Sequence, residues 1–186
     1  RDADISAGPL CYTRAMKSRL KLLEILADGR FHSGETLGSQ LGVSRAAIWK
    51  QLRGLETLGL TLQSVRGRGY RLAQPIEFLS EERICTQLTP TGRTQITQLE
   101  IFPELVSTNA HLKTCAVQGA ASGAVCLAEA QTAGRGRLGR VWVSPFACNL
   151  YLSLLWRFNT GPAGLAGLSL VVGVALVRAL SGHLPQ

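Results

Sequence analysis

The chain has few cysteines, and their positions exclude two common kinds of small domain. The five cysteines are an odd number, none stand close together, and no group of Cys and His has the spacing of a zinc site. A disulfide framework and a zinc finger are therefore both disfavoured. Unpaired core thiols in a reducing, cytoplasmic compartment are the better interpretation, and no bound metal is expected from the sequence.

The sequence also lacks a signal peptide and a long apolar run. The first residues do not have the basic-then-apolar order of a signal peptide. The apolar stretch 163–177 has fifteen residues, includes three glycines and is followed by Arg178. It falls short of the roughly 20 residues that span a membrane. We expect a buried helix over 163–180 that packs on a sheet, with no membrane contact.

Acidic residues are scarce, and the imbalance is concentrated in the first part of the chain. There are 20 Lys and Arg against 12 Asp and Glu, and residues 1–72 hold twelve of the basic and six of the acidic residues. This segment is the natural candidate for contact with a polyanion. The only methionine, Met16, precedes the first helical pattern, so we expect residues 1–15 to be a leader or upstream extension.

Residues 16–74 have the pattern of a winged helix-turn-helix domain. Apolar residues at helical spacing predict a helix over 17–26, and Ser33 and Ser44 are placed to cap two further helices separated by a short turn. Two short strands around Arg66-Gly67-Arg68-Gly69 would form a basic wing. Helix, short turn, helix and basic hairpin in this order are typical of DNA-binding proteins.

The outer face of the second of these helices and the tip of the wing carry the candidate DNA contacts. Basic side chains near a helix start suit the major groove, and arginines at a hairpin tip suit phosphates or the minor groove. A solvated basic face, or a surface for protein contacts, is the alternative. The candidate residues are Ser44, Arg45, Ala46, Trp49, Lys50, Arg53, Arg66 and Arg68.

After a linker around Pro75, residues 80–186 alternate between helical and strand patterns, which indicates an α/β arrangement. We expect a helix over 81–88 and a turn over 89–92. The predicted strands cover 96–102, 124–130 and 149–156, the last dense enough in apolar residues to be buried on both faces. Ser107, Thr108 and Asn109 stand at a strand-to-helix junction, where one of them would cap the helix.

Residues 134–140 alternate three glycines with three arginines between two predicted buried strands. Glycine permits close backbone approach, and arginine pairs in two-pronged fashion with carboxylate or phosphate. A nucleic-acid-binding Arg-Gly segment and a solvated turn are the alternatives, but neither explains why the loop joins buried strands. The phosphate-binding pattern G-x-x-x-x-G-K-[ST] is absent. The loop predicts a site for an anionic ligand.

Residues 131–140, Trp142, Ser144-Pro145 and Asn149-Leu150-Tyr151 resemble the signature of biotin protein ligases, and Ser107-Thr108-Asn109 resembles their upstream substrate motif. The winged helix resembles that of the bifunctional subgroup that is also the biotin operon repressor. The resemblance covers residues 17–182. It implies an α+β protein, with the winged helix-turn-helix followed, over 80–186, by part of an α/β ligase catalytic domain whose mixed sheet is like that of class II synthetases.

The resemblance also implies substrates, partners and roles. Biotin and ATP, with Mg²⁺, would give biotinyl-5′-AMP, and a lysine of the biotin carboxyl carrier protein would then receive the biotinyl group. Operator DNA and a second copy, in an adenylate-bound homodimer of the full-length protein, are the other partners. The implied biotin-binding residues are Ser107, Thr108, Asn109, Gln131, Arg135, Gly136 and Arg137; the implied adenylate loop includes Gly134, Arg140 and Trp142.

Two departures from the family pattern qualify these expectations. Val106 stands where many members have an acidic residue, and the sequence stops before the Lys-Trp-Pro-Asn-Asp motif whose lysine contacts biotin and phosphate. We therefore expect residues 1–186 alone to lack ligase activity. For the longer protein, the alternative to a ligase is a DNA-binding regulator that senses biotin or its adenylate without catalysis.

Overall fold

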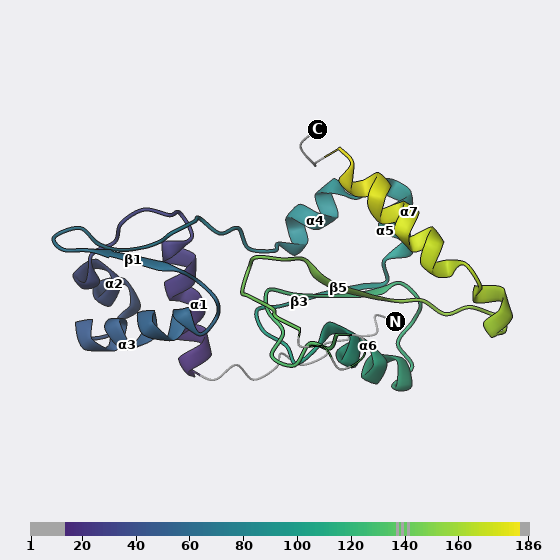
Figure 1. The fold of residues 1–186 in the computed structure, drawn as a ribbon, viewed down its shortest axis with the longest axis horizontal. Coiled ribbons are helices and arrows are strands. Elements are labelled where there is room, and N and C mark those ends of the chain that lie inside the picture. The colour runs from purple at the N-terminus through teal and green to yellow at the C-terminus, as the bar shows by residue number, and fades with distance from the viewer. Residues whose placement is uncertain (1–13, 137, 139, 141, 183–186) are drawn as a thin grey trace, which may run out of the picture. The chain divides into compact units, whose positions relative to one another are not determined.

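The computed structural model describes residues 14–136, 138, 140 and 142–182. The chain divides into two compact units, Arg1–Leu155 and Trp156–Gln186, and each is described by itself (Figure 1). Residues 1–13 of the predicted extension 1–15, together with Cys11 and the predicted site residue Arg137, lie outside the described residues.

The first unit begins with the predicted winged helix. Its elements are α1 (Arg14–Leu26), α2 (Gly34–Leu41), α3 (Arg45–Glu56) and an antiparallel hairpin of β1 (Leu62–Val65) and β2 (Gly69–Leu72). Both predicted caps are confirmed, because Ser33 Oγ accepts from the Thr36 N–H and Ser44 Oγ accepts from the Ala47 N–H. Capping satisfies backbone donors that have no partner within the helix and so sets where α2 and α3 begin.

The three helices bury leucine and isoleucine side chains in one core. The residues concerned are Leu22, Leu23, Leu26, Leu37, Ile48, Leu52 and Leu55. His32 forms an isolated antiparallel bridge to the hairpin, because its backbone exchanges two hydrogen bonds of 2.9 Å with that of Tyr70. Gly69 beside this bridge has φ 103° and leaves no room for a Cβ against the His32 carbonyl, so glycine is required there.

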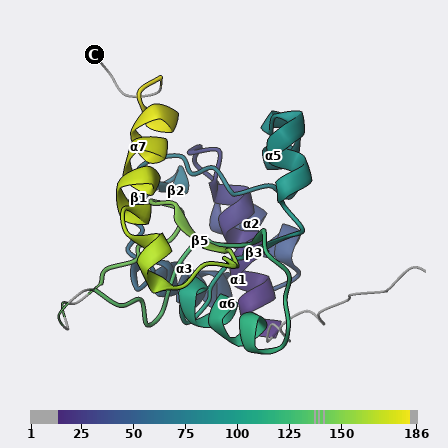
Figure 2. The same cartoon turned by 90° about the vertical axis from the view of Figure 1, so that its right-hand side faces the viewer.

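The rest of the first unit is a three-stranded mixed sheet with helices on both sides. The strands β3 (Gln98–Phe102), β4 (Ala124–Ala128) and β5 (Tyr151–Leu155) lie in that order, with β3 parallel and β5 antiparallel to β4. Helix α6 (Thr108–Val117) connects β3 to β4 and lies on one side of the sheet, whereas α5 (Pro90–Gln95) lies on the other side in both views (Figures 1 and 2). The predicted α+β fold with a mixed sheet is confirmed.

Contacts within this unit join the sheet segment to the winged helix. The Phe146 N–H donates to the Leu58 carbonyl, just beyond α3, at 3.0 Å. Phe146 and Ala130 are also buried in the same apolar cluster as the leucines of α1 and α3. The chain that follows the Gly/Arg loop is therefore packed directly against the end of α3.

Two predictions within the first unit are wrong. The stretch 89–92 is not a simple turn but opens α5, because Thr89 Oγ1 accepts from the Gly92 N–H and Pro90 occupies the first helical position, which proline favours. Strand β5 is not buried on both faces, because Leu152 and Leu154 are about half exposed. Its other side chains, such as Ser153, face α6.

The second unit contains a short 3-10 helix, η2 (Pro162–Leu165), and helix α7 (Leu168–Leu180). The prediction that this apolar helix is buried is wrong for this structure, since no residue of α7 is buried and Leu170 is 74% exposed. A helix that is apolar on every side needs cover on every side, and the 31 residues of this unit do not supply it.

By length and composition alone, Ala163–Leu180 could cross a membrane, because the apolar stretch over η2 and α7 continues past Arg178 and reaches eighteen residues. The predicted length of fifteen residues is thus corrected to eighteen. Interior helices of proteins pass the same test, and the absence of membrane contact stays a prediction.

Candidate functional site

A cavity of about 530 Å³ lies in the first unit where α6 begins and β5 starts. It brings together six of the predicted ligand-binding residues from three separate stretches of the chain: Ser107, Thr108, Asn109, Gln131, Arg135 and Trp142. Five further residues line it: Ala110, Lys113, Leu150, Tyr151 and Leu152.

The three polar residues at the start of α6 have different tasks. Ser107 is the cap, with its Oγ accepting from the Ala110 N–H at 3.4 Å. Thr108 is buried, whereas Asn109 is exposed and lines the cavity. The prediction that one of the three is used in capping is confirmed, and Asn109 is the side chain left for a ligand.

Gln131 lines the cavity and holds the first turn of α6 in place. Its Oε1 accepts from the Thr108 N–H at 2.9 Å and lies 3.3 Å from the Thr108 hydroxyl, which is itself 2.8 Å from Ser153 Oγ. A hydroxyl has one hydrogen to donate, so the chain runs from Ser153 to Thr108 to Gln131. The Gln131 amide nitrogen makes none of these bonds and remains available to a ligand.

The Gly/Arg loop folds back so that its glycines carry close contacts. Trp142 lies against Gly134, where a Cβ would come within 3.1 Å of the indole Cγ and Nε1, and Arg140 lies against Gly136 in the same way. Arg135 and Trp142 line the cavity, whereas Gly134, Gly136 and Arg140 are not among the described residues that do so. The predicted loop residues therefore divide into those that face the cavity and those that shape the loop.

The Ser-Pro and Asn-Leu-Tyr segments are linked by the Tyr151 hydroxyl. This hydroxyl donates to the Pro145 carbonyl at 3.1 Å and accepts from Asn149 Nδ2 at 2.9 Å. Beside it, Ser144 Oγ is buried and has no hydrogen-bond partner among the described residues. A buried hydroxyl without a partner costs free energy, and Ser144 is not among the described residues that line the cavity.

The charge of the cavity favours an anion. Lys113 and Arg135 are its charged lining residues among those described, and no carboxylate lines it. The amino terminus of α6 adds the positive end of a helix dipole. Trp142, Leu150 and Leu152 add apolar surface, so the cavity suits a carboxylate or phosphate attached to an apolar or ring-shaped body.

Sequence reasoning missed Lys113 as a lining residue. The available signal was the helical spacing, since Lys113 follows Asn109 by four residues and therefore lies on the same face of α6. Val106, which departs from the family pattern, is 60% exposed and is not among the described lining residues.

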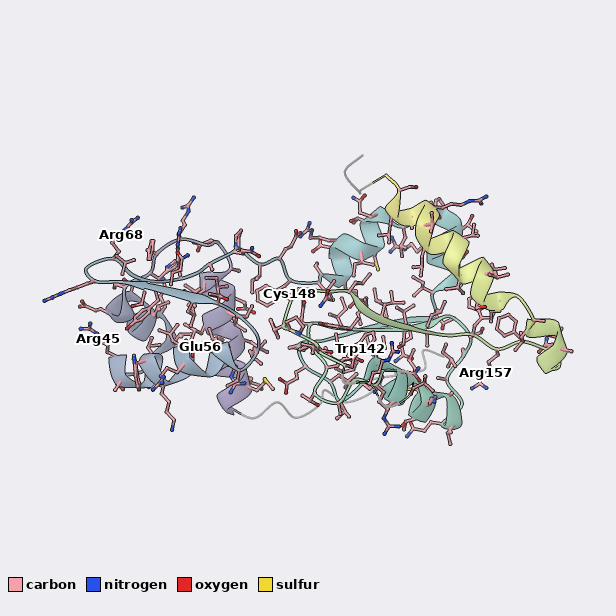
Figure 3. The ribbon with its side chains drawn as sticks, in the orientation of Figure 1. Arg45, Glu56, Arg68, Trp142, Cys148 and Arg157 are labelled. Atoms are coloured by element: carbon pink, nitrogen blue, oxygen red, sulfur yellow. The ribbon has the colours of Figure 1, made fainter. Side chains whose placement is uncertain are left out.

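The predicted DNA-contact residues are exposed on the winged helix. Arg45, Ala46, Trp49, Lys50 and Arg53 are on the open side of α3, opposite the buried Ile48, Leu52 and Leu55. The Arg53 guanidinium lies 4.9 Å from the Trp49 ring centre, and that of Arg68 lies 4.5 Å from the Phe31 ring. Figure 3 shows Arg45 at the start of α3 and Arg68 on the hairpin. Stacking holds two of the arginines in place, and Ser44 serves as the cap of α3.

Comparison with known proteins gives the same two parts. Residues 18–71 match an HTH domain, and residues 102–186 match the biotin/lipoate A/B protein ligase family. The bifunctional ligase/repressor BirA of Salmonella typhimurium is 46% identical over 87% of this chain and 48% of its own length. The proteins of the same name from Escherichia coli and Bacillus subtilis are 45% and 34% identical, over 87% and 89% of this chain and 48% and 51% of their own lengths.

This chain is a ligase/repressor homologue. It spans about half the length of these relatives. The predicted resemblance is confirmed, and so is the order of its parts, since the helix-turn-helix of this homologue precedes the ligase segment. The cavity described above is formed within that ligase segment, by residues 107–152.

Proposed function

We propose that the protein carrying this chain is an ATP-dependent biotin protein ligase that also represses transcription in response to biotin. Biotin and ATP would form biotinyl-5′-AMP and pyrophosphate. The amine of a carrier-protein lysine would then attack the biotinyl carbonyl, forming an amide and releasing AMP. The names of the relatives, which join ligase and repressor, support this combination.

The observation that carries the proposal is the cavity in which two cations, a helix amino terminus and an apolar wall converge. The first step brings a carboxylate against a polyphosphate, and the two repel each other. Lys113 and Arg135 would offset that repulsion in both the ground state and the transition state. The apolar side chains Trp142 and Leu152 would cover the ligand and exclude water, which otherwise hydrolyses a reactive acyl adenylate.

The polar side chains would orient biotin rather than react with it. Asn109 and the free amide of Gln131 supply donors and acceptors toward the cavity, and the bonds from Gln131 to Thr108 hold that amide in one position. Ordered donors of this kind reduce the entropy lost when a ligand is bound. Mg²⁺ would accompany ATP as part of the substrate.

The repressor function would use the exposed face of α3 and the hairpin. Their basic residues suit operator DNA, and a dimer formed when the adenylate is bound would place two such surfaces on one operator. The carrier protein and the operator are thus the proposed partners, and the cytoplasm, where both are found, is the proposed location.

The test uses the complete protein that contains this chain. It is mixed with biotin, Mg²⁺-ATP and a biotin carboxyl carrier protein, and pyrophosphate release and streptavidin-detectable carrier are measured. We expect both products, and we expect neither when biotin is omitted. Tight binding of biotin without pyrophosphate release would overturn the ligase and support a biotin-sensing regulator. Failure to bind biotin would overturn both.

A further inference from the structure

Three side chains of different chemistry meet between β3 and α6, away from the ligand cavity. His111 Nε2 lies 2.9 Å from Glu100 Oε2, and Cys115 Sγ lies 3.6 Å from the same His111 nitrogen. The three donor atoms all lie within 4.8 Å of one another. None of these residues lines the cavity described above.

The fold explains why the three residues meet. His111 and Cys115 are four residues apart on α6 and so share one face of the helix. Glu100 pairs in register with Cys126, and Cys126 with Ser153, whose hydroxyl bonds to Thr108 of α6. Residues in register point to the same face of a sheet, so Glu100 points toward α6.

The imidazole of His111 is held in its position from a second direction. The ring of Phe102 packs edge-on against it, with 5.0 Å between ring centres and 67° between planes. Side-chain exposures of 24% for His111 and 18% for Glu100 leave the group reachable from solvent. The arrangement is therefore both ordered and open.

We propose that Glu100, His111 and Cys115 bind one divalent transition-metal ion, for which Zn²⁺ is the best match. Carboxylate oxygen, imidazole nitrogen and thiolate sulfur are the three ligand types that zinc prefers. Around a tetrahedral ion with bonds of about 2.0–2.3 Å, ligand atoms lie roughly 3.3–3.7 Å apart. The observed 2.9 Å between Glu100 and His111 requires a small widening, and the 3.6 Å between His111 and Cys115 already fits. The Glu100 and Cys115 atoms, which lie within 4.8 Å of each other, would have to settle at about 3.5 Å.

The charges and protons of the site balance. A thiolate and a carboxylate offset the two positive charges of the ion, and neutral His111 adds none. Binding replaces the Cys115 S–H bond with a sulfur–metal bond and releases that proton to solvent. The proton that His111 Nε2 donates to Glu100 must also leave Nε2, with Nδ1 protonated from solvent in exchange, so that the Nε2 lone pair can bind the ion. A water molecule would complete the tetrahedron, as in other sites with three protein ligands.

Spacing along the chain alone does not reveal this site. His111 and Cys115 have a helical spacing that many residue pairs share, and the third ligand comes from a strand eleven residues earlier. The expectation of no metal from the sequence depended on the lack of a Cys/His cluster. The proposal does not depend on the ligase function, since it concerns a separate group of residues that would tie α6 to β3.

The test is titration of metal-free, reduced protein with Co²⁺, followed by competition with Zn²⁺. We expect one Co²⁺ per chain, a thiolate-to-cobalt absorption band, and displacement of Co²⁺ by Zn²⁺. Cys115→Ser should abolish the band and weaken Zn²⁺ binding at least about 10-fold. His111→Gln should weaken it to a similar degree. Zn²⁺ should also raise the unfolding temperature of the unaltered protein and not that of Cys115→Ser.

Two cysteine variants are matched controls, because Cys85 and Cys148 are free thiols outside the group. Cys85→Ser and Cys148→Ser should each retain the absorption band and the Zn²⁺ affinity. Thermal unfolding without metal establishes that each variant is folded. The proposal is overturned if the folded, unaltered protein shows no thiolate band with Co²⁺, or if Cys115→Ser binds Zn²⁺ as tightly as the unaltered protein does.

Discussion

Trp142 packs directly on the backbone of Gly134, at the start of the Gly/Arg loop. A Cβ at position 134 would lie 3.1 Å from the indole Cγ and Nε1 and closer still to Cδ1. Real Cβ atoms do not approach other side chains so closely, so glycine is needed for space, not for an unusual φ. The loop therefore presents Trp142 and Arg135 to the cavity from one folded-back segment.

Gly134→Ala should weaken biotin binding by about 10-fold or more, because displacement of a ligand-positioning group by about 1 Å has effects of this size or greater. The added methyl group must push Trp142 away from its place beside the cavity. Calorimetric titration of the complete protein with biotin measures the change, and quenching of tryptophan fluorescence by the ligand reports on Trp142 itself.

Gly173→Ala is the matched control for this substitution. Gly173 lies in α7, and a Cβ there would meet no atom within 4 Å. Alanine also favours the helix over glycine. Gly173→Ala should bind biotin normally, and equal affinity in Gly134→Ala and the unaltered protein would contradict the role given to this contact.

Two substitutions of Gln131 should have different effects, one on the stability of the protein and the other on its affinity for biotin. Gln131→Leu removes the acceptor for the Thr108 N–H, and leaving a part-buried donor without a partner should lower the free energy of unfolding by about 1–3 kcal/mol. Gln131→Glu keeps an oxygen acceptor but adds a negative charge to a cavity suited to anions. It should be near normal in stability and at least about 10-fold weaker for biotin.

Denaturant unfolding and biotin titration of both variants provide the measurements. Normal biotin affinity in Gln131→Glu would argue against an anionic ligand in this cavity. An unchanged free energy of unfolding in Gln131→Leu would show that the Thr108 N–H finds another acceptor.

Local signals in the sequence predicted most of the elements. Ser33, Ser44 and Ser107 were each predicted at or beside a helix start, and each accepts a hydrogen bond from the backbone N–H three residues on. Such caps are read within four residues of sequence and do not depend on the rest of the fold. The motif residues that line the cavity were found because they recur in a known family.

Features that depend on packing could not be predicted in this way. The group of Glu100, His111 and Cys115 depends on how α6 sits on the sheet, which no short stretch specifies. The error at α7 has the same origin, since an apolar helix reveals its need for cover but not what covers it. The one-sided burial of β5 likewise depends on which layers the structure contains.

Glu129 should make stability depend on pH in a direction unusual for a carboxylate. Burial raises the pKa of Glu129, and the hydrogen bond from the Leu79 N–H, at 2.6 Å, opposes this only in part. The folded protein therefore holds this proton to higher pH than the unfolded chain does. The stabilising contribution of the protonated form is fully present below the pKa that Glu129 has in the unfolded chain. It is lost as pH rises through the pKa that Glu129 has in the folded protein.

Glu129→Gln replaces the ionisable carboxyl group with a neutral amide and keeps an oxygen that can accept from the Leu79 N–H. The variant should be more stable than the unaltered protein at neutral pH, and the difference should shrink as the pH falls. Glu82→Gln, at an exposed position on helix α4 (Glu81–Gln87), is the control and should show no such trend. Denaturant unfolding at a series of pH values measures all three proteins, and a difference that grows toward acid would contradict the burial argument.

The last prediction concerns the wing. Arg68 is exposed on the hairpin and is held 4.5 Å from the Phe31 ring, which suits a fixed contact with a phosphate rather than with a base edge. Arg68→Ala should weaken binding to operator and to unrelated DNA by similar factors, and should reduce the slope of log affinity against log salt by about 1.

Arg93→Ala, at an exposed position on α5, removes the same charge away from the winged helix and should change neither quantity. Fluorescence anisotropy with both DNAs over a range of salt concentrations provides the measurement. A loss confined to the operator would instead place Arg68 against a base edge.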